Sequence, residues 1–547
     1  MNIFKHKLFG NNGLKIFQKF RLNAGPTQVM KSEGIFVVTI VLVIHISLLV
    51  YSDFVHSPTN GEIPALPSGI YHLTTGEFDL FRVNPPLVRS VSAIPILFMS
   101  PSTDWSNCHD VILSRDEFPV GAEFVRMNGK RSFFFFSIAR LMCIAFSILG
   151  AFVCFSWARE LYGEKSGLVA LLLWCFSPTI LGHGSTICAD LPSAACGILA
   201  CYQFWNWLRS PSWSQALFAG FALGLAELTK TTWIILFGLL PSLFLIYFLQ
   251  TKITRPYKQL IVIILVGIFC INLGYGFERF GMPLGNFRFI SHSLGGRYFD
   301  DNKKIIGGNR FKNTIIGHCP VPLPANYVAG IDTQKSDFEF RSDNYLCGTW
   351  KYGGWWYYYL FSFLVKEPIG MLILFFIATV ITFRQCPVKW KDETILLLPA
   401  LCVFILASSQ TGMNHHYRYI LPIFPFLFVW LAKVGECHFK TAIILLSYFA
   451  FSSISTYPHS LSYFNEFVGG AKNGPKYLLG SNVDWGQDVL LLKKWYDEHT
   501  ESRPFYLECA SYFDPVVAGI GYQKINPNDM RPGWYAVSVN CLYNREG

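Results

Sequence analysis

The stretch Ala158–Pro192, ARELYGEKSGLVALLLWCFSPTILGHGSTICADLP, contains the alternation that decides the fold. A basic turn with Arg159 and Lys165 is followed by an apolar run from Ser166 and then by the loop 182–190, which has no Lys or Arg. About 20 mostly apolar residues cross the roughly 30 Å hydrocarbon core of a bilayer. Basic turns that alternate with loops free of basic residues are typical of a chain that crosses the membrane repeatedly.

The composition of the whole chain agrees with this interpretation. Of 547 residues, 52% are hydrophobic and 15% are charged, whereas about 25% are charged in a typical soluble protein. The net charge of +10 does not indicate a nucleic-acid partner, because the basic residues fall in short clusters between apolar runs. We therefore expect lipid, and no nucleic acid, around most of the chain.

Working outward from this stretch, we find eleven apolar runs long enough to be spans. They begin near Gly34, Phe133, Ser166, Leu191, Trp213, Thr231, Gln259, Pro368, Thr394, Tyr419 and Thr441. The sequence thus predicts an all-α polytopic membrane protein with about eleven transmembrane helices. The first run follows some thirty polar residues without a small-residue cleavage site, so we expect it to be retained as a span.

Charge in the short loops predicts the orientation of these spans. Counting from a basic N-terminal segment, every second short loop carries Lys or Arg, and such loops remain in the cytoplasm. We predict a cytoplasmic segment 1–33, a transmembrane domain 34–456 with outer loops 52–131 and 277–355, and an extracytoplasmic C-terminal domain 457–547.

The last 90 residues mix charged and apolar positions, as small soluble domains do. Asp488–Glu498 has helical spacing, whereas Phe505–Cys509 and Trp534–Val539 alternate like strands. We therefore expect a small α/β domain.

Two cysteine pairs fall on the predicted outer side. Cys319 and Cys347 share one loop, and Cys509 and Cys541 share the tail. Each pair is either a disulfide, if that compartment is oxidising, or two free thiols.

Charged residues at the edge of a membrane are costly, so each one is a candidate for function. The first outer loop holds Glu62, Arg82 and Arg89, and it contains a segment 87–98 that suits an amphipathic interfacial helix. An ordinary membrane-surface loop is the structural alternative.

Three further groups of polar residues lie at predicted outer span ends. His183 and Asp190 flank one short loop, where Asp190 could equally cap the helix that begins at Leu191-Pro192. Lys230 either reaches the interface by snorkelling or contacts phosphate. The motif HHYRY with His415, His416 and Arg418 suits an anionic head group, or else an interfacial belt of Tyr and Arg.

Carboxylates and cations gathered at one membrane face suit an enzyme that handles a lipid-linked phosphosugar. The residue pattern alone also allows a transporter of an anionic substrate. That alternative needs charges within spans, for which Glu278 and the pair Lys366-Glu367 are the candidates.

Several motifs, in order along the chain, resemble the GT-C glycosyltransferases related to protein O-mannosyltransferases and aminoarabinose transferases. They are FDLFRVNPPLVR (Phe78–Arg89), the opening stretch Ala158–Pro192, GLAELTK (Gly224–Lys230), RYILPIFPF (Arg418–Phe426) and SYFNEFVGGAKNGPKYLLGSNVDWGQD (Ser462–Asp488). The last motif is the most specific, and it is similar to the tail of bacterial members.

The resemblance implies roles for individual residues. The family's first outer loop carries an Asp-Glu pair whose Asp is the catalytic base, and Gly61-Glu62 occupies the matching positions, so the Asp is absent. The family's second acidic site corresponds to Asp190, and its phosphate-binding Lys corresponds to Lys230. The base is then Glu62 or Asp190, or the protein is a pseudoenzyme that binds polyprenyl phosphate.

The implied activity is transfer of a sugar, with inversion, from a polyprenyl-phosphate donor to the hydroxyl of a protein, lipid or glycan acceptor. Lys230 and Arg418 would neutralise the phosphate, with Arg82, Arg89, His183, His415 and His416 as further substrate-binding candidates. We expect no metal or other cofactor, and a location in a bacterial inner membrane with the site facing the exterior.

Overall fold

The computed structural model describes residues 32–106, 108, 115–248, 256–296, 307–384, 390–414 and 416–543. The predicted cytoplasmic segment 1–33, except for its last two residues, lies outside the described residues, as does His415.

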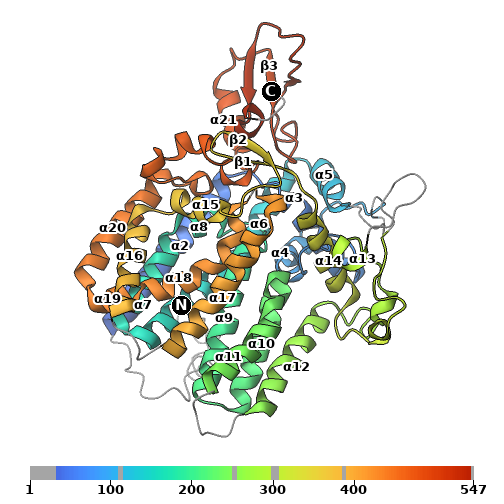
Figure 1. Ribbon diagram of the computed structural model, residues 1–547. Helices are drawn as coiled ribbons and strands as arrows, with labels where there is room; N and C mark the ends of the chain where they lie inside the picture. Colours follow the sequence, from blue (N-terminus) through green and yellow to red (C-terminus); the bar gives the residue numbers. More distant parts are fainter. Residues whose placement is uncertain are drawn as a thin grey trace, which may run out of the picture.

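A bundle of helices makes up most of the molecule (Figure 1). Its main helices are α2 (Ser32–Val55), α6 (Arg131–Tyr162), α7 (Glu164–Phe176), α9 (Asp190–Arg209), α10 (Trp213–Thr229), α11 (Leu236–Phe248), α12 (Tyr257–Gly274), α16 (Ile369–Arg384), α17 (Trp390–Ser409), α18 (Phe424–Leu431) and α20 (Phe439–Thr456). Short helices join them, namely α8 (Pro178–His183), η1 (Thr231–Ile235), α15 (Tyr358–Lys366), η4 (Thr411–Met413), η5 (Tyr417–Ile423) and α19 (Lys433–Cys437). The predicted helical membrane fold is confirmed.

Seven helical segments within the described residues are long and apolar enough to cross a membrane. Helices α15 and α16 together are also long and apolar enough, but the chain bends by 115° between them, as in a broken span or a re-entrant loop. Each predicted apolar run coincides with a helix, but α7 and α10, with 13 and 17 residues, are short for a complete span. The count of eleven spans stays a prediction.

Small residues let helices α10 and α12 pack closely. A Cβ atom added to Gly220 would lie 2.7 Å from Cβ of Val266, and one added to Gly224 would lie 2.3 Å from Cβ of Cys270. A Gly-x-x-x-Gly spacing places both glycines on one helix face, which is the arrangement that brings helices together in membranes. This packing fixes the end of α10, where Lys230 follows.

The first predicted outer loop is largely helical. It forms α3 (Glu62–Thr75), α4 (Leu87–Leu97) and α5 (Glu117–Asn128), and α4 matches the expected amphipathic helix. The second loop contains η2 (Leu284–Asn286), α13 (His292–Gly295), η3 (Ile315–His318), α14 (Ala325–Glu339) and an antiparallel hairpin of β1 (Asp343–Leu346) and β2 (Thr349–Tyr352).

The C-terminal segment lies at one end of the bundle, at the top of Figure 1. It consists of η6 (Ser460–Ser462), η7 (Glu466–Val468), η8 (Ala471–Lys476), η9 (Gly480–Asn482), α21 (Val489–Glu498), β3 (Phe505–Glu508), β4 (Gln523–Lys524), β5 (Trp534–Val537) and α22 (Val539–Leu542). The strands form a parallel sheet in the order β4-β3-β5, which confirms the predicted helix, strands and α/β character.

This segment does not have a core of its own. Val489, Tyr496 and Phe505 share one hydrophobic cluster with Ile63 of α3 and Phe124 of α5. The small sheet and the first outer loop therefore support each other. The cysteines 319, 347, 509 and 541 are free thiols in the structure.

Candidate functional site

Three charged residues from distant parts of the chain meet where helices begin or end. Asp190 is the first residue of α9, Lys230 follows the last residue of α10, and Arg418 lies in η5. Asp190 makes no side-chain capping bond, since the N-cap position is Ala189 and no side chain caps this end. The capping interpretation of Asp190 is therefore wrong, and its carboxylate is turned to the two cations instead.

The Asp190 carboxylate binds both cations directly. Nζ of Lys230 donates to Oδ1 at 2.6 Å, and Nη1 of Arg418 donates to Oδ2 at 3.1 Å. The Asp190 and Lys230 side chains are 5% and 6% exposed, and that of Arg418 is 16% exposed. Two cations around one carboxylate leave a net positive charge in a nearly dry site, which favours an anionic ligand.

Aromatic faces enclose the two cations. The guanidinium of Arg418 lies 4.0 Å from the ring centroid of Trp485, and Nζ of Lys230 lies 5.3 Å from that of Tyr419. Cation–π contacts of this kind are worth about 0.5–2 kcal/mol, most when desolvated. Trp485 belongs to the C-terminal segment, so the tail forms one wall of the site.

Two buried nitrogen atoms beside this cluster have no hydrogen-bond partner among the described residues. They are Nε of Arg418 and Nδ1 of His183. Both side chains line a narrow cavity together with Tyr417, Ser481 and Lys366. Burial lowers the pKa of His183 to about 4, so its ring is neutral near pH 7. Both nitrogens lie beside one cavity, where each can bind a polar ligand atom or a water.

His416 lies close to the same cavity. Its Nδ1 is 2.7 Å from Oγ of Ser481, which lines the cavity, and its ring packs edge-on against Tyr419. This places His416 beside the cation cluster.

Glu62 occupies a different environment. It is fully buried, and its carboxylate accepts two hydrogen bonds from Arg140, two from Thr59 and one from the backbone N–H of Ile187. Burial alone would raise the pKa of this carboxyl, but the charge and hydrogen bonds of Arg140 and the backbone bonds outweigh it and hold the pKa below its ordinary value. Because both Glu62 oxygens already accept hydrogen bonds from the protein, this carboxylate is poorly placed to remove a proton from an acceptor.

Gly61 faces the ring of Trp485. A Cβ atom added at Gly61 would lie 2.4 Å and 2.8 Å from two ring carbons of Trp485 and 3.2 Å from Sγ of Cys188. The space that a longer side chain at this position would use is therefore occupied by the indole from the tail.

The two first-loop arginines bind other groups. Nε of Arg82 donates to Oδ1 of Asn326, and Nε of Arg89 donates to Nε2 of His72 at 2.8 Å. Arg89 is also buried against Phe81, and burial lowers its pKa to about 10. The cations that contact Asp190 are Arg418 in η5 and Lys230 at the end of α10.

Lys366, Glu367 and Glu278, the charged residues that a transporter would need within its spans, form hydrogen bonds to neighbouring segments. Lys366 donates to the backbone oxygens of Leu461 and Asn482 at 2.9 and 2.8 Å, and Glu367 accepts from the hydroxyls of Thr179 and Tyr417. These bonds hold the bend between α15 and α16. Glu278, which follows α12, binds Asn326 of the second outer loop.

Sequence reasoning missed Arg140, Asp53 and Trp485. Nη1 of Arg140 also contacts Oδ1 of Asp53 at 3.3 Å, so one arginine holds two buried carboxylates. The available signal was a charge ten residues into the apolar helix α6, a position that only function or pairing explains.

A second, open cavity of about 610 Å³ lies beside the β1–β2 hairpin. Arg341 and Lys351 line it together with Trp355, Trp356 and Tyr357. Aromatic faces combined with cations suit a sugar-bearing or anionic ligand.

Comparison with known proteins relates the chain to sugar transferases. Residues 134–275 match the family model described as dolichyl-phosphate-mannose-protein mannosyltransferase. This segment runs from α6 to the residue after α12 and includes Asp190 and Lys230. No curated protein matches the chain.

Several solved structures are similar to the whole chain. The ArnT structure from Cupriavidus metallidurans bound to undecaprenyl phosphate is 12% identical, with a TM-score of 0.47 over 90% of this chain and 86% of that one. The apo oligosaccharyltransferase of Archaeoglobus fulgidus is 13% identical, with a TM-score of 0.45, and the match covers 89% of this chain and 64% of that one. The resemblance that the sequence motifs indicated is confirmed: residues 134–275 match the model of the protein mannosyltransferase family.

Proposed function

We propose that this protein is a membrane glycosyltransferase that moves a sugar from a polyprenyl-phosphate donor to an acceptor hydroxyl. The observation that carries the proposal is the buried Asp190 carboxylate between Lys230 and Arg418. The site faces the non-cytoplasmic side according to the charge pattern of the loops, which in a bacterium is the periplasm or exterior.

The two cations stabilise the phosphate that leaves the sugar. Lys230 and Arg418 bind the donor phosphate, and the free Nε of Arg418 supplies a further donor to a phosphate oxygen. As the bond between the anomeric carbon and the phosphate oxygen breaks, negative charge grows on the phosphate, and the two cations stabilise it. His183 lines the cavity beside the phosphate, where the sugar would lie, and His416 lies next to it through its contact with Ser481.

The acceptor side needs a base, and Asp190 suits this role better than Glu62. Asp190 binds Arg418, which lines the cavity, and it shares both of its cations with the donor phosphate, whereas Glu62 is enclosed by Arg140 and backbone N–H groups. The acceptor oxygen attacks the anomeric carbon opposite the phosphate, its proton passes to Asp190, and the configuration at that carbon inverts.

Binding of the lipid phosphate tests the cation assignment. We expect Lys230→Met to weaken binding of polyprenyl phosphate in nanodiscs by roughly 10-fold or more, since one charge-assisted hydrogen bond is worth about 1.5–3 kcal/mol. Tryptophan quenching at Trp485 or a radioligand assay measures it. Lys335→Met is the matched control, because Lys335 forms a partly exposed pair with Glu339 on α14. Equal binding by wild type and Lys230→Met would contradict the phosphate role.

The fate of the lipid-linked donor distinguishes a transferase from a transporter of the same lipid. A transferase converts the labelled donor into free polyprenyl phosphate and a glycosylated acceptor, whereas a flippase moves the intact donor across proteoliposomes. The bonds that fasten Lys366 and Glu367 in the fold do not favour the transporter.

A polyprenyl-phosphate-binding pseudoenzyme is the second candidate, and the contact of Gly61 with Trp485 favours it. In the family that the motifs resemble, an Asp occupies position 61. Here the indole fills that space, so the chain lacks both the carboxylate and the room for one.

A paired substitution tests the pseudoenzyme. We expect Gly61→Asp alone to reduce the yield of folded protein, because its Cβ would collide with the Trp485 ring. Gly61→Asp with Trp485→Ala removes the collision and is compared with Trp485→Ala alone. If the protein is an active enzyme, the added Asp should change the transfer rate by less than about 10-fold. A gain of about 100-fold or more, which is the effect expected of a restored general base, would favour the pseudoenzyme.

A further inference from the structure

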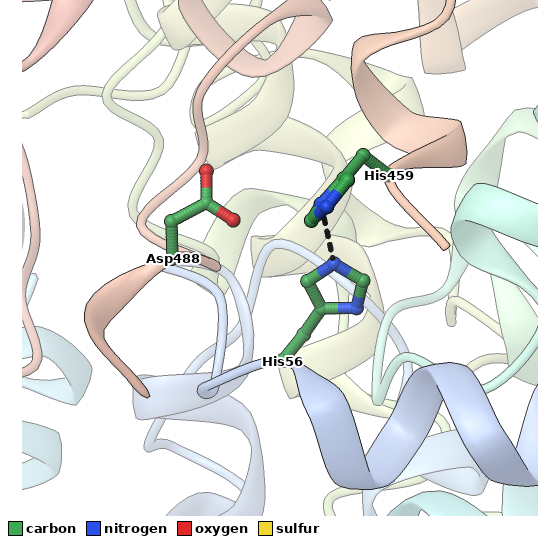
Figure 2. A group of neighbouring side chains, drawn as sticks. All are labelled: His56, His459 and Asp488. Carbon is green, nitrogen blue, oxygen red and sulfur yellow. Dashed lines mark hydrogen bonds between the residues drawn. The ribbon is translucent and has the colours of Figure 1, made fainter. Parts of the chain in front are cut away.

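Three side chains that bind metals well converge away from the cation cluster. They are His56, just after α2, His459, between α20 and η6, and Asp488, just ahead of α21. One potential ligand atom from each lies within 4.8 Å of the other two. Figure 2 shows a ring nitrogen of His56 directed at His459, whose ring is nearly perpendicular to it, with the Asp488 carboxylate beside them.

The His56 ring is held in the tautomer that a metal needs. Its Nδ1 lies 2.9 Å from the backbone oxygen of Ser52, and because a carbonyl only accepts, this nitrogen carries the proton. The lone pair is then on Nε2, which points at His459. A backbone carbonyl that orients a histidine through its other nitrogen is the usual support of a metal-bound imidazole.

The spacing of the two imidazoles fits one ion. Nε2 of His56 accepts a hydrogen bond from Nδ1 of His459 at 3.3 Å, and a bound ion replaces the proton of this bond, which is released to solvent. Two nitrogens at about 2.0–2.1 Å from a tetrahedral zinc lie about 3.3–3.4 Å apart. The rings can accept an ion between them with little movement, and the carboxylate supplies a third ligand.

The segments that carry the ligands are held in place by other bonds. Ser57 donates from its backbone N–H to the oxygen of Gln487 and from its hydroxyl to that of Gly486, and it accepts from the N–H of Val489. The hydroxyl of Tyr457 donates to the oxygen of Leu48 in α2. The three ligands therefore lie on a rigid frame, as a metal site requires.

We propose that His56, His459 and Asp488 bind a divalent transition-metal ion of the zinc class, with water at the fourth position. Two imidazoles and one carboxylate favour such an ion over Mg²⁺ or Ca²⁺, which prefer oxygen ligands. The ion joins α2, the end of α20 and the start of α21, so its role is to fasten the C-terminal segment to the bundle. This revises the expectation from sequence that the protein binds no metal, and it does not depend on the transfer reaction.

Zinc binding to the purified full-length protein in nanodiscs tests the site, with an affinity tag free of histidine. After chelation and reloading with Zn²⁺, we expect about one tightly bound equivalent per chain by elemental analysis, and a higher thermal unfolding temperature. His459→Ala should weaken Zn²⁺ binding by more than about 10-fold. This side chain is exposed, so the variant should fold without metal.

The control variant is His318→Ala, which removes an exposed histidine from η3. It should bind Zn²⁺ as the wild type does. The proposal is overturned if wild type and His459→Ala retain equal Zn²⁺, if Zn²⁺ leaves the unfolding temperature unchanged, or if Mg²⁺ raises it as much. Asp488→Asn provides an independent variant should His459→Ala fail to fold, and it should also weaken Zn²⁺ binding.

Discussion

Asp190→Asn is expected to lower the rate of sugar transfer by about 100-fold or more while the protein still binds polyprenyl phosphate. Loss of a general base costs about 10²–10⁴ in rate. The amide keeps the shape of the side chain but removes the anion that competes with phosphate for Lys230 and Arg418. Donor affinity should therefore stay equal or rise as transfer falls, a combination that a merely misfolded variant cannot produce.

Single-turnover transfer and phosphate binding are measured on the same nanodisc preparation. The matched control is Asp332→Asn, which alters another buried carboxylate that accepts backbone N–H bonds from Ile290 and Ser291. Its folded fraction should transfer sugar at the normal rate. If Asp190→Asn also transferred normally, Asp190 would be only a counter-ion, and the base would have to be sought elsewhere.

The elements that sequence predicted well are those whose pattern is local. The alternation of Trp534–Val537 and the helical spacing of Val489–Glu498 each depend on neighbours within a few residues, so β5 and α21 were predictable. The residue types at the site were also predictable, because a buried charge at a membrane edge requires an explanation wherever it occurs.

The pairing of those charges was not predictable from spacing. Asp190 is 40 residues from Lys230 and 228 from Arg418, and only the packing of α9, α10 and η5 brings them together. The contact between Gly61 and Trp485 and the bond between His56 and His459, 403 residues apart, depend on how the tail folds back over the bundle. No periodicity carries this information.

A local break that composition does not reveal lies inside one of the predicted apolar runs. The run from Ser166 continues in hydropathy as far as Leu181, but Ser177 caps a new helix that starts at Pro178. Proline at the first position of a helix and Ser at its N-cap end α7 after 13 residues. Capping chemistry thus divided a segment that composition alone would have joined.

Arg140→Met is expected to destabilise the protein by about 3–5 kcal/mol, because it leaves the Glu62 and Asp53 carboxylates buried without their cation. Arg140 also donates to the backbone oxygens of His56 and Ser57, so it connects α6 with the end of α2 and the start of α3. We expect loss of monodisperse protein in detergent and a large fall in unfolding temperature. Arg126→Met, which removes an exposed pair with Glu123, should cost at most about 1 kcal/mol.

Glu62→Gln distinguishes a structural carboxylate from a catalytic one. Because the pKa of Glu62 is held below its ordinary value in the folded protein, its contribution to stability is present above about pH 4.3 and is lost as the pH falls through the folded-state pKa. Glu62→Gln should therefore lower stability at pH 7 and flatten the acid side of the stability profile. The double variant with Arg140→Met should recover part of the loss, since neither charge is then buried alone. Should Glu62→Gln instead retain full stability and lose transfer, the base would be Glu62, and the assignment of Asp190 would fail.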